Sequence, residues 1–433
     1  MSEIRVDVSQ AIAELPVAQY QEKVNAIHEE LHSGKNGFTG WVDYPSTVEG
    51  DLVWRIMTTA WKIQKQCTAF VVIGVGGSYL GAKACLELLQ SPFYNEFFAK
   101  ERNLPKIYFA GHHLSSVYYH ELFHRLRKEE VAVCVISRSG STLEPMIVFE
   151  MFKKFMEEKY GDEANERIYV VTGSKGKLRD EANEKGYTTF DVPDDIVGRF
   201  SVLTPVGLLP IAVAGIDLEA VLQGARQAQA ATANPDLNEN DCYRYALTRH
   251  LLKEQQDKRM EVFEVYDGKL RYFTEWMKQL FGESECQNGQ GVFPVSMQMS
   301  TDLHSLGQFL QEGRQDFFET AVIIEDVTYD IMLPEGITDH AKTLHQMNQL
   351  VRESVKEAHL ENGTPNIVIT LPEISAYSFG KMVYFFEKAC AVSCMLSDLD
   401  PFVQPGVERY KEKLLTFLKD NTVEAEDVCR ITE

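Results

Sequence analysis

Short apolar segments alternate with longer helical segments twice along this chain, and that alternation limits the folds it can adopt. The second alternation begins at Met260 with MEVFEVYD and continues through TAVIIED and NIVITL before long C-terminal helices. Strands that alternate with helices form parallel sheets covered by helices on both faces. The sequence therefore predicts an α/β protein with two α/β/α domains. The strands expected in the first alternation are 70–74, 106–110, 131–136 and 167–172.

The expected domain boundaries follow from these two alternations. Helical periodicity between Gln19 and His32 predicts a helical extension before the first sheet. No low-complexity linker separates the two α/β regions, so we expect them to pack tightly around a cleft, where ligands commonly bind. The expected segments are a helical N-terminal extension (1–60), a first α/β domain (61–215), a helical connection (216–258) and a second α/β domain with C-terminal helices (259–433).

The segment VAVCVISRSGSTLEP, residues 131–145, predicts an anion site. A β-branched strand ends there in a hydroxyl-rich loop, and an acidic helix-forming stretch follows. The first N–H groups of a helix have no partner within the helix and carry partial positive charge, which suits a phosphate. The loop residues expected near such a phosphate are Ser137, Arg138, Ser139, Ser141 and Thr142.

A second turn of the same kind lies upstream, in TAFVVIGVGGSYLGAK. An apolar strand ends at Gly74, and Gly76 and Gly77 let the backbone approach a ligand before Ser78 starts the next helix. Two turns suited to bind phosphate in one α/β unit indicate that the ligand is a sugar phosphate. The alternative for either turn is that its serines and glycines only shape the turn and cap the helix.

The common nucleotide-binding motifs do not fit this chain. A G-x-G-x-x-G register that starts at Gly74 puts Tyr79 in place of the third glycine, and no acidic residue ends a second strand at the expected distance. The chain also lacks G-x-x-x-x-G-K-[ST], the phosphate-binding loop of many nucleotide hydrolases and kinases. Dinucleotide binding and kinase chemistry are therefore disfavoured.

The charge balance disfavours two classes of partner. The 433 residues include 43 basic and 64 acidic ones, a net charge of −21, which repels nucleic acid and anionic lipid membranes. The N-terminus, MSEIRVDVSQ, does not look like a secretory signal, and no apolar run approaches the ~20 residues that span a membrane. Eight cysteines form no metal-type pairs, and Cys134 and Cys390 lie in patterns typical of buried thiols. We expect a cytoplasmic protein.

The second domain carries the candidate for a general base. An aromatic amphipathic stretch, Tyr272 to Phe281, meets Gly282, which places Glu283 at a helix end where its side chain can face a cleft. A carboxylate that aromatic neighbours partly desolvate has a raised pKa, which suits a general base. Spacing alone, however, favours a solvated surface glutamate.

Two further candidates lie downstream of this helix. Ser300 and the residues after it look like a helix start, which places His304 in the first turns of a helix. Gln404 opens a loop-to-helix turn, and Lys411 lies in the first turns of the helix that follows. Taken singly, each is also compatible with a hydrogen-bonded histidine or an ordinary surface lysine.

Two H-E-x-x-H strings offer a competing class, that of zinc hydrolases. They occupy residues 28–32 and 120–124, and each puts two histidines on one helical face. Both lie on highly charged helical stretches with no obvious third ligand. Solvated helix histidines are therefore the preferred interpretation.

Longer motifs extend over nearly the whole chain: GFTGWVDYP, VVIGVGGSYLGA, SRSGSTLEP, VGRFSVLTPVGLLP, KQLFGESE, STDLHSLGQFLQEGR, YFFEKACA and QPGVERYK. By these motifs, which occur in the family's order, the chain resembles the glucose-6-phosphate isomerase family in its bacterial form. The resemblance implies two sugar-isomerase domains, with an active site between them and beside the partner subunit of a homodimer. It also implies interconversion of glucose 6-phosphate and fructose 6-phosphate, with no cofactor and no metal.

The resemblance further implies roles for single residues. Glu283 matches the base that moves a proton from C2 to C1 through a cis-enediol, and Arg199 matches the arginine that stabilises negative charge on the reacting oxygens. The phosphate would lie against Gly77, Ser78, Ser137, Arg138, Ser139 and Thr142. The residues that would contact the sugar or assist ring opening are Gln279, His304, Gln404 and Lys411. In the family, the histidine comes from the neighbouring subunit.

The chain departs from the family's pattern near the expected base. Cys286-Gln287 stands where the family usually has Gly-Lys, which removes a positive charge, while Val197 and Val403 replace the usual Gly and Asp. We expect a working enzyme with a locally altered loop. A noncatalytic sugar-phosphate sensor is the remaining alternative, since isolated sugar-isomerase domains also serve in regulators. The expected base and ring-opening groups argue against a sensor, because binding alone needs no base.

Overall fold

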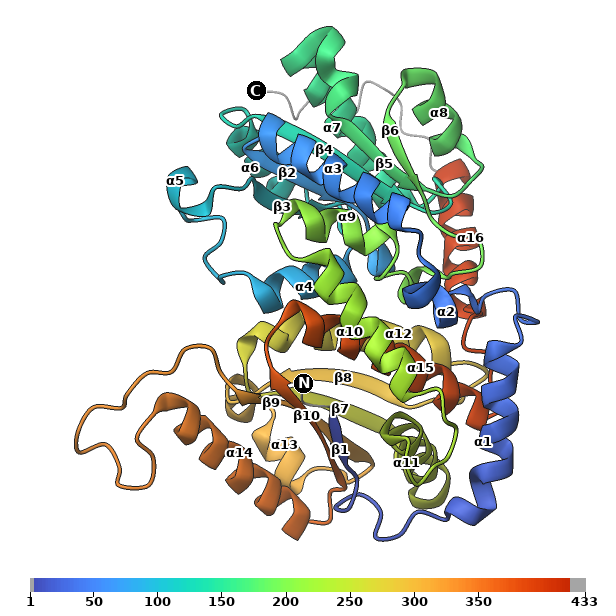
Figure 1. Ribbon diagram of the computed structural model, residues 1–433, viewed down its shortest axis with the longest axis vertical. Helices are drawn as coiled ribbons and strands as arrows, with labels where there is room; N and C mark the ends of the chain where they lie inside the picture. The colour runs from blue at the N-terminus through green and yellow to red at the C-terminus, as the bar shows by residue number, and fades with distance from the viewer. Residues whose placement is uncertain (1–3, 421–433) are drawn as a thin grey trace.

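The computed structural model describes residues 4–420, and its strands form two five-stranded sheets, one in each half of the molecule in Figure 1. The strands of the upper sheet are β2 (Ala69–Ile73), β3 (Lys106–Ala110), β4 (Val131–Ser137), β5 (Ile168–Thr172) and β6 (Thr188–Asp191). They lie in the order β3-β2-β4-β5-β6, and all neighbouring strands are parallel. The carboxyl ends of these strands therefore meet at one edge, where ligands bind in open α/β sheets.

Helices cover both faces of the upper sheet because its central strands are apolar on both sides. Cys134 of β4 belongs to an apolar cluster with the first of two helix groups, and Val133 to a cluster with the second. The first group is α3 (Gly50–Gln66), α4 (Leu80–Leu89) and α9 (Pro205–Val213). The second group is α6 (Ser116–Leu126), α7 (Leu143–Tyr160) and α8 (Lys177–Lys185).

The lower sheet is mostly parallel. Its strands are β1 (Arg5–Asp7), β7 (Met260–Val265), β8 (Phe293–Gln298), β9 (Phe317–Asp326) and β10 (Asn366–Glu373), in the order β1-β10-β9-β7-β8. One face packs on α11 (Asp241–Gln256), α12 (Arg271–Glu285) and α15 (Ala376–Leu396). The opposite face carries α13 (Gly307–Glu312) and α14 (Leu344–Glu361). The edge strand β1 runs antiparallel to β10, which differs from the expected all-parallel arrangement.

Helices between the sheets join the two halves. One apolar cluster includes Phe70 of the upper sheet and Phe263 of the lower sheet, so the core is continuous from one half to the other. Within it, α4 packs against α12, and α10 (Leu218–Ala231) packs against α15. The remaining helices are α1 (Val17–His32), α2 (Gly40–Thr47), the short α5 (Ala99–Arg102) and α16 (Pro405–Asp420). In Figure 1, α16 leaves the lower half and lies beside the upper one.

The structure confirms the two expected α/β units and the strands predicted from apolar runs. The sequence prediction missed β1, β6 and β8, which are short or carry a proline. The described part of the expected N-terminal extension, residues 4–60, contributes to both halves, because β1 extends the lower sheet whereas α3 packs on the upper one. The domain boundaries themselves stay a prediction. Among residues 4–420, no helix is both long and apolar enough to cross a membrane.

Candidate active site

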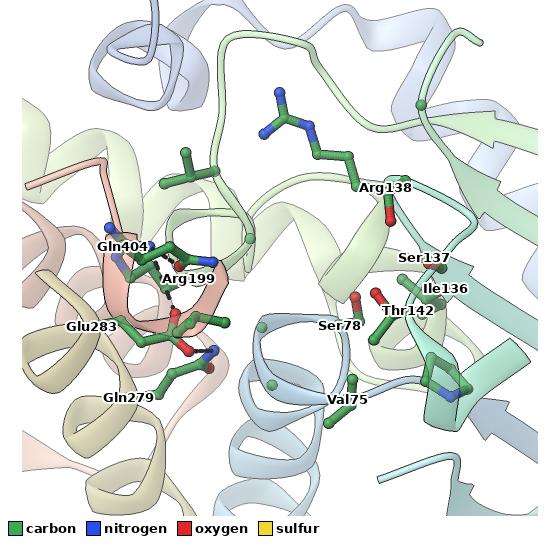
Figure 2. Close-up of a pocket in the computed structure, with 18 of the residues that line it drawn as sticks. Val75, Ser78, Ile136, Ser137, Arg138, Thr142, Arg199, Gln279, Glu283 and Gln404 are labelled. Atoms are coloured by element: carbon green, nitrogen blue, oxygen red, sulfur yellow. Dashed lines mark hydrogen bonds and ion pairs between the residues drawn. The ribbon is translucent and has the colours of Figure 1, made fainter. Parts of the chain in front are cut away.

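A cavity of about 700 Å³ lies between the two halves. Its walls come from the loops after β2, β4 and β5 of the upper sheet, and from α12 and the start of α16. Figure 2 shows hydroxyl groups on one side of this cavity and a cluster of charged and amide side chains on the other. The expected site residues that line it are Gly77, Ser78, Ser137, Arg138, Ser139, Thr142, Arg199, Gln279, Glu283, Gln404 and Lys411.

The hydroxyl side is built on the turn between β4 and α7. Thr142 is the N-cap residue of α7, yet its side chain makes no capping hydrogen bond, so its hydroxyl is left for a ligand in the cavity. Ser137 is partly a turn residue, because its Oγ accepts a hydrogen bond from the backbone N–H of Gly140 at 3.2 Å. The alternative of turn shaping thus applies to Ser137 but does not account for Thr142. The first N–H groups of the 18-residue α7 add an anion-binding helix end.

The turn after β2 is pressed against the opposite wall. A Cβ atom on Gly77 would lie 2.2 Å from the main-chain oxygen of Gly198, so only glycine allows this approach. Gly76 has a φ of +57°, which glycine adopts without strain. Ser78 does not start the next helix as expected. Residues Gly76–Ser78 form a 3₁₀ turn, η1, and α4 begins at Leu80.

Arg138 lines the cavity but does not point at the hydroxyl groups. Its guanidinium donates a hydrogen bond to the main-chain oxygen of Asp194 and lies 5.7 Å from the centre of the Phe38 ring. In Figure 2 the guanidinium lies well apart from Ser78 and Thr142. Arg138 therefore adds positive charge to the cavity wall without approaching the hydroxyl groups of Ser78 and Thr142.

Arg199 is the centre of the charged side. It lies in the 3₁₀ turn η3 (Gly198–Phe200), and its residue is only 2% exposed. Its Nη1 lies 3.6 Å from Oε2 of Glu283 and donates to Oε1 of Gln404 at 2.8 Å. Its Nε donates to Oγ of Ser284 at 2.7 Å, and its Nη2 donates to the main-chain oxygen of Pro401 at 2.6 Å. Burial lowers the pKa of Arg199, and Glu283 opposes that shift, so the guanidinium stays a fixed cation at neutral pH.

Glu283 lies in the last turn of α12. The sequence predicted that the helix would end at Gly282, but it runs on through Gly282 to Glu285. A Cβ atom at position 282 would lie 3.3 Å from Cγ of Pro294 in β8. The Glu283 side chain is one-third exposed (33%) and lines the cavity, so it is not the freely solvated glutamate that spacing favoured. Gln279, one turn earlier, donates through Nε2 to Oε1 of Glu283 at 3.3 Å. Oε1 of Gln279 is buried with no hydrogen-bond partner, so it can accept from a ligand hydroxyl.

His304 does not line the cavity. It is the last residue of a short 3₁₀ turn, η5 (Thr301–His304), and it is exposed. The expected helix start is also displaced, because α13 begins only at Gly307. In a single copy of the chain, His304 therefore lies outside the set of residues that line this cavity.

The zinc-hydrolase strings lie outside the cavity. We expected a solvated histidine at position 28, but His28 is partly buried. Its Nδ1 lies 2.7 Å from the hydroxyl oxygen of Tyr243, and burial lowers its pKa to about 4. His120 and His124 are exposed on α6. Among residues 4–420, no group of three or more His, Cys, Asp or Glu side chains is arranged to hold a metal ion.

Some cavity residues were not predicted from the sequence. Lys175 follows β5, so it lies at the same sheet edge as the two turns that were predicted. The Gly-Ser-Lys string after the expected strand at 167–172 was a usable signal for it. The other unpredicted lining residues include Ser174, Asp194, Phe402 and Tyr410, for which no local pattern stands out.

Comparisons with known proteins identify the family of this chain. A family model described as phosphoglucose isomerase matches residues 33–320. The chain is 46% identical to a glucose-6-phosphate isomerase of Acetivibrio thermocellus and 41% identical to one of Fusobacterium nucleatum, with 96% of each chain covered in both cases.

Solved structures give the same result at the level of the fold. A hypothetical protein from Thermus thermophilus superposes with a TM-score of 0.84 at 29% identity, covering 97% of this chain and 100% of that one. A glucose-6-phosphate isomerase from Chlamydia trachomatis superposes with a TM-score of 0.78 at 20% identity, covering 96% of this chain and 87% of that one. Sequence, fold and family model together show that the chain belongs to the phosphoglucose isomerase family.

Proposed function

We propose that the cavity between the two halves is the site where this chain interconverts glucose 6-phosphate and fructose 6-phosphate. The activity itself follows from membership of the family and from 46% identity to a glucose-6-phosphate isomerase over nearly the whole chain. The observation that carries the site is the pairing of Glu283 with the buried Arg199 at 3.6 Å, in one cavity with the hydroxyl groups of Ser78 and Thr142.

The phosphate would bind on the hydroxyl side. Ser78, Ser137, Ser139 and Thr142 offer short donors there, and the N-terminal end of α7 offers unpaired N–H groups and a favourable dipole. Arg138 adds positive charge at the rim. Held at this end, the dianion positions the sugar carbons against the opposite wall, and such positioning removes several kcal/mol of barrier.

Glu283 is the proposed base. It would take the proton from C2 and return it to C1, so the aldose and the ketose interconvert through a cis-enediol. Negative charge builds on the sugar oxygens during this transfer, and the fixed cation of Arg199 stabilises it more strongly than it stabilises the substrate. The proton that leaves one carbon returns to the next and no electrons are gained or lost, so the reaction calls for no redox cofactor.

Ring opening requires further groups. We assign Lys411 and His304 to the proton transfer between the ring oxygen and the anomeric hydroxyl, and Gln279 and Gln404 to contacts with the sugar. Lys411, Gln279 and Gln404 line the cavity, whereas His304 would reach it from a second copy. The proposal therefore includes a homodimer whose two copies share each site. It also places the protein in the cytoplasm.

Replacing Glu283 tests the proposal most directly. The change Glu283→Gln keeps the shape and removes the base, and we expect kcat to fall by about 10²- to 10⁴-fold in an assay coupled to fructose 6-phosphate conversion. Glu275→Gln is the matched control, because Glu275 lies on the same helix, pairs with Lys278 and does not line the cavity. Near-normal turnover by Glu283→Gln would exclude Glu283 as the base. Binding of the sugar phosphate without turnover by the unchanged protein would favour a sensor.

A further inference from the structure

The residue after the α12 C-cap joins two parts of the site. Gln287 is only 7% exposed. Its Nε2 donates to the main-chain oxygen of Ser284 at 2.6 Å and to that of Asp400 at 2.7 Å, and the main-chain oxygen of Val403 lies 3.5 Å away. The two hydrogens of one amide nitrogen thus match two nearby carbonyl groups.

The segments that Gln287 joins carry most of the charged side of the cavity. Ser284 follows Glu283 directly, and its carbonyl is one of the last four of α12, which have no partner within the helix. Asp400 lies in the loop between α15 and α16, which leads to Gln404. Arg199 joins the same two segments from the other side, through Oγ of Ser284 and the main-chain oxygen of Pro401. The base and the loop are therefore connected twice, once by a cation and once by a neutral amide.

We propose that Gln287 is a positioning residue for the isomerase reaction, which holds the turn of Glu283 against the loop of Gln404 without placing a positive charge beside the base. This inference rests on the proposed function of Glu283. It also gives the altered loop a role, because Gln287 and Val403, both departures from the family's pattern, meet at this contact.

The neutrality of the amide matters because Glu283 already pairs with one cation, in a cavity that three more cations line. Arg199 approaches it from η3, and Lys411 of α16 and Lys175 and Arg138 of the upper half line the same cavity. The acidic groups nearby are Asp194 on the cavity wall, Asp400 in the loop and Glu285, which Arg249 neutralises. A further cation at position 287 would favour the ionised carboxylate and lower the proton affinity of the base.

Two substitutions separate the positioning role from the charge effect. Gln287→Met keeps the length of the side chain and removes both donors, so we expect kcat to fall about tenfold, with KM changed less than about twofold and the pH profile unmoved. Gln287→Lys restores N–H donors and adds a charge. We expect it to keep most of kcat at pH 8 and to move the acid limb of the kcat/KM profile about half a pH unit or more lower.

Gln290→Lys is the matched control. Gln290 is an exposed residue of the same loop, so the added charge is screened by solvent and both kcat and the acid limb should stay unchanged. Wild-type kcat in Gln287→Met, or an unshifted acid limb in Gln287→Lys, would overturn the inference. If thermal melting shows that Gln287→Met does not fold, the Gln287→Lys profile alone decides. Unchanged protein without isomerase activity defeats the proposed function, whereas active variants that match the unchanged protein defeat only this inference.

Discussion

The two sheets bury different kinds of side chain. Strands β2, β4 and β5 of the upper sheet consist almost wholly of buried apolar residues. The lower sheet instead buries carboxylates: Glu261 and Glu264 on β7 and Glu319 on β9 are at most 2% exposed. The half that carries the proposed phosphate site thus rests on an apolar scaffold. The half that carries the proposed base rests on buried polar networks.

One such network holds the end of α12. Arg249 is 1% exposed, and its Nε donates to Oε2 of Glu261 at 2.7 Å while its Nη2 donates to Oε2 of Glu285 at 3.1 Å. The guanidinium carbon also lies 4.0 Å from the centre of the Phe281 ring. Glu285 is two residues beyond Glu283, so this cluster fixes the turn that presents the base. The difference between the sheets teaches that directional contacts fix the geometry of the lower half. Removing one partner of such a contact costs much stability, because the other partner stays buried and unpaired.

The largest effect is expected when that network loses its cation. Arg249→Met leaves Glu261 and Glu285 buried and unpaired, so we expect the free energy of unfolding to fall by about 3–5 kcal/mol in urea titrations. Lys154→Met is the upper-half control, because Lys154 pairs with Glu158 on the surface of α7, where the two side chains are 80% and 67% exposed. Its cost should be about 1 kcal/mol or less. Equal costs for the two changes would contradict the contrast between the halves.

A smaller effect is expected from the hydroxyl side, and on binding rather than on stability. Thr142→Val keeps the shape of the side chain and removes a donor that α7 does not use as a cap. A hydrogen bond to a charged group contributes about 1.5–3 kcal/mol, so KM should rise about tenfold or more. Steady-state kinetics and thermal melting measure the two quantities. Ser116→Ala, at an exposed position at the start of α6 and outside the cavity lining, is the control, and an unchanged KM in Thr142→Val would place the phosphate elsewhere.

The same contrast explains what the sequence could predict. Continuous apolar runs such as residues 131–136 identified buried parallel strands, and the hydroxyl-rich turns after them predict an anion site, because both signals are local. The short strands β1 and β6 carry too few apolar residues to stand out. A short strand that is stabilised mainly by neighbouring strands has no long apolar run in its own sequence from which it could be predicted.

The charged side of the cavity could not be assembled from local patterns. Arg199 meets Gln404, which is 205 residues away in the chain, and Ser284, which is 85 residues away. Contacts of this kind depend on how the two halves pack, so Glu283 and Lys411 were singled out chiefly by the resemblance to the family. Gln287 was noted only as a missing charge, because its two carbonyl acceptors are visible only in the folded chain.

The smallest effect expected concerns the pH dependence of stability in the lower sheet. Glu264 is 2% exposed, and burial, followed by the nearby Glu319, raises its pKa well above the usual value, although Tyr266 donates to it at 3.0 Å. The folded state therefore holds this proton more tightly than the unfolded state does. The stability that protonation gives is fully present below the unfolded pKa, near 4.5, and is lost as the pH rises through the folded value.

Glu264→Gln removes this titration and keeps a neutral polar group. We expect the variant to gain about 1 kcal/mol or more over the unchanged protein between pH 5 and pH 8, measured as free energy of unfolding at both values. Val135→Thr in β4 is the upper-sheet control, because it buries a hydroxyl that does not titrate in this range, so its cost should be the same at both pH values. The opposite result would be a difference in free energy of unfolding, between Glu264→Gln and the unchanged protein, that is the same at both pH values. It would mean that Glu264 is ionised in the folded state over this whole range, so that the lower sheet holds a buried charge at that position.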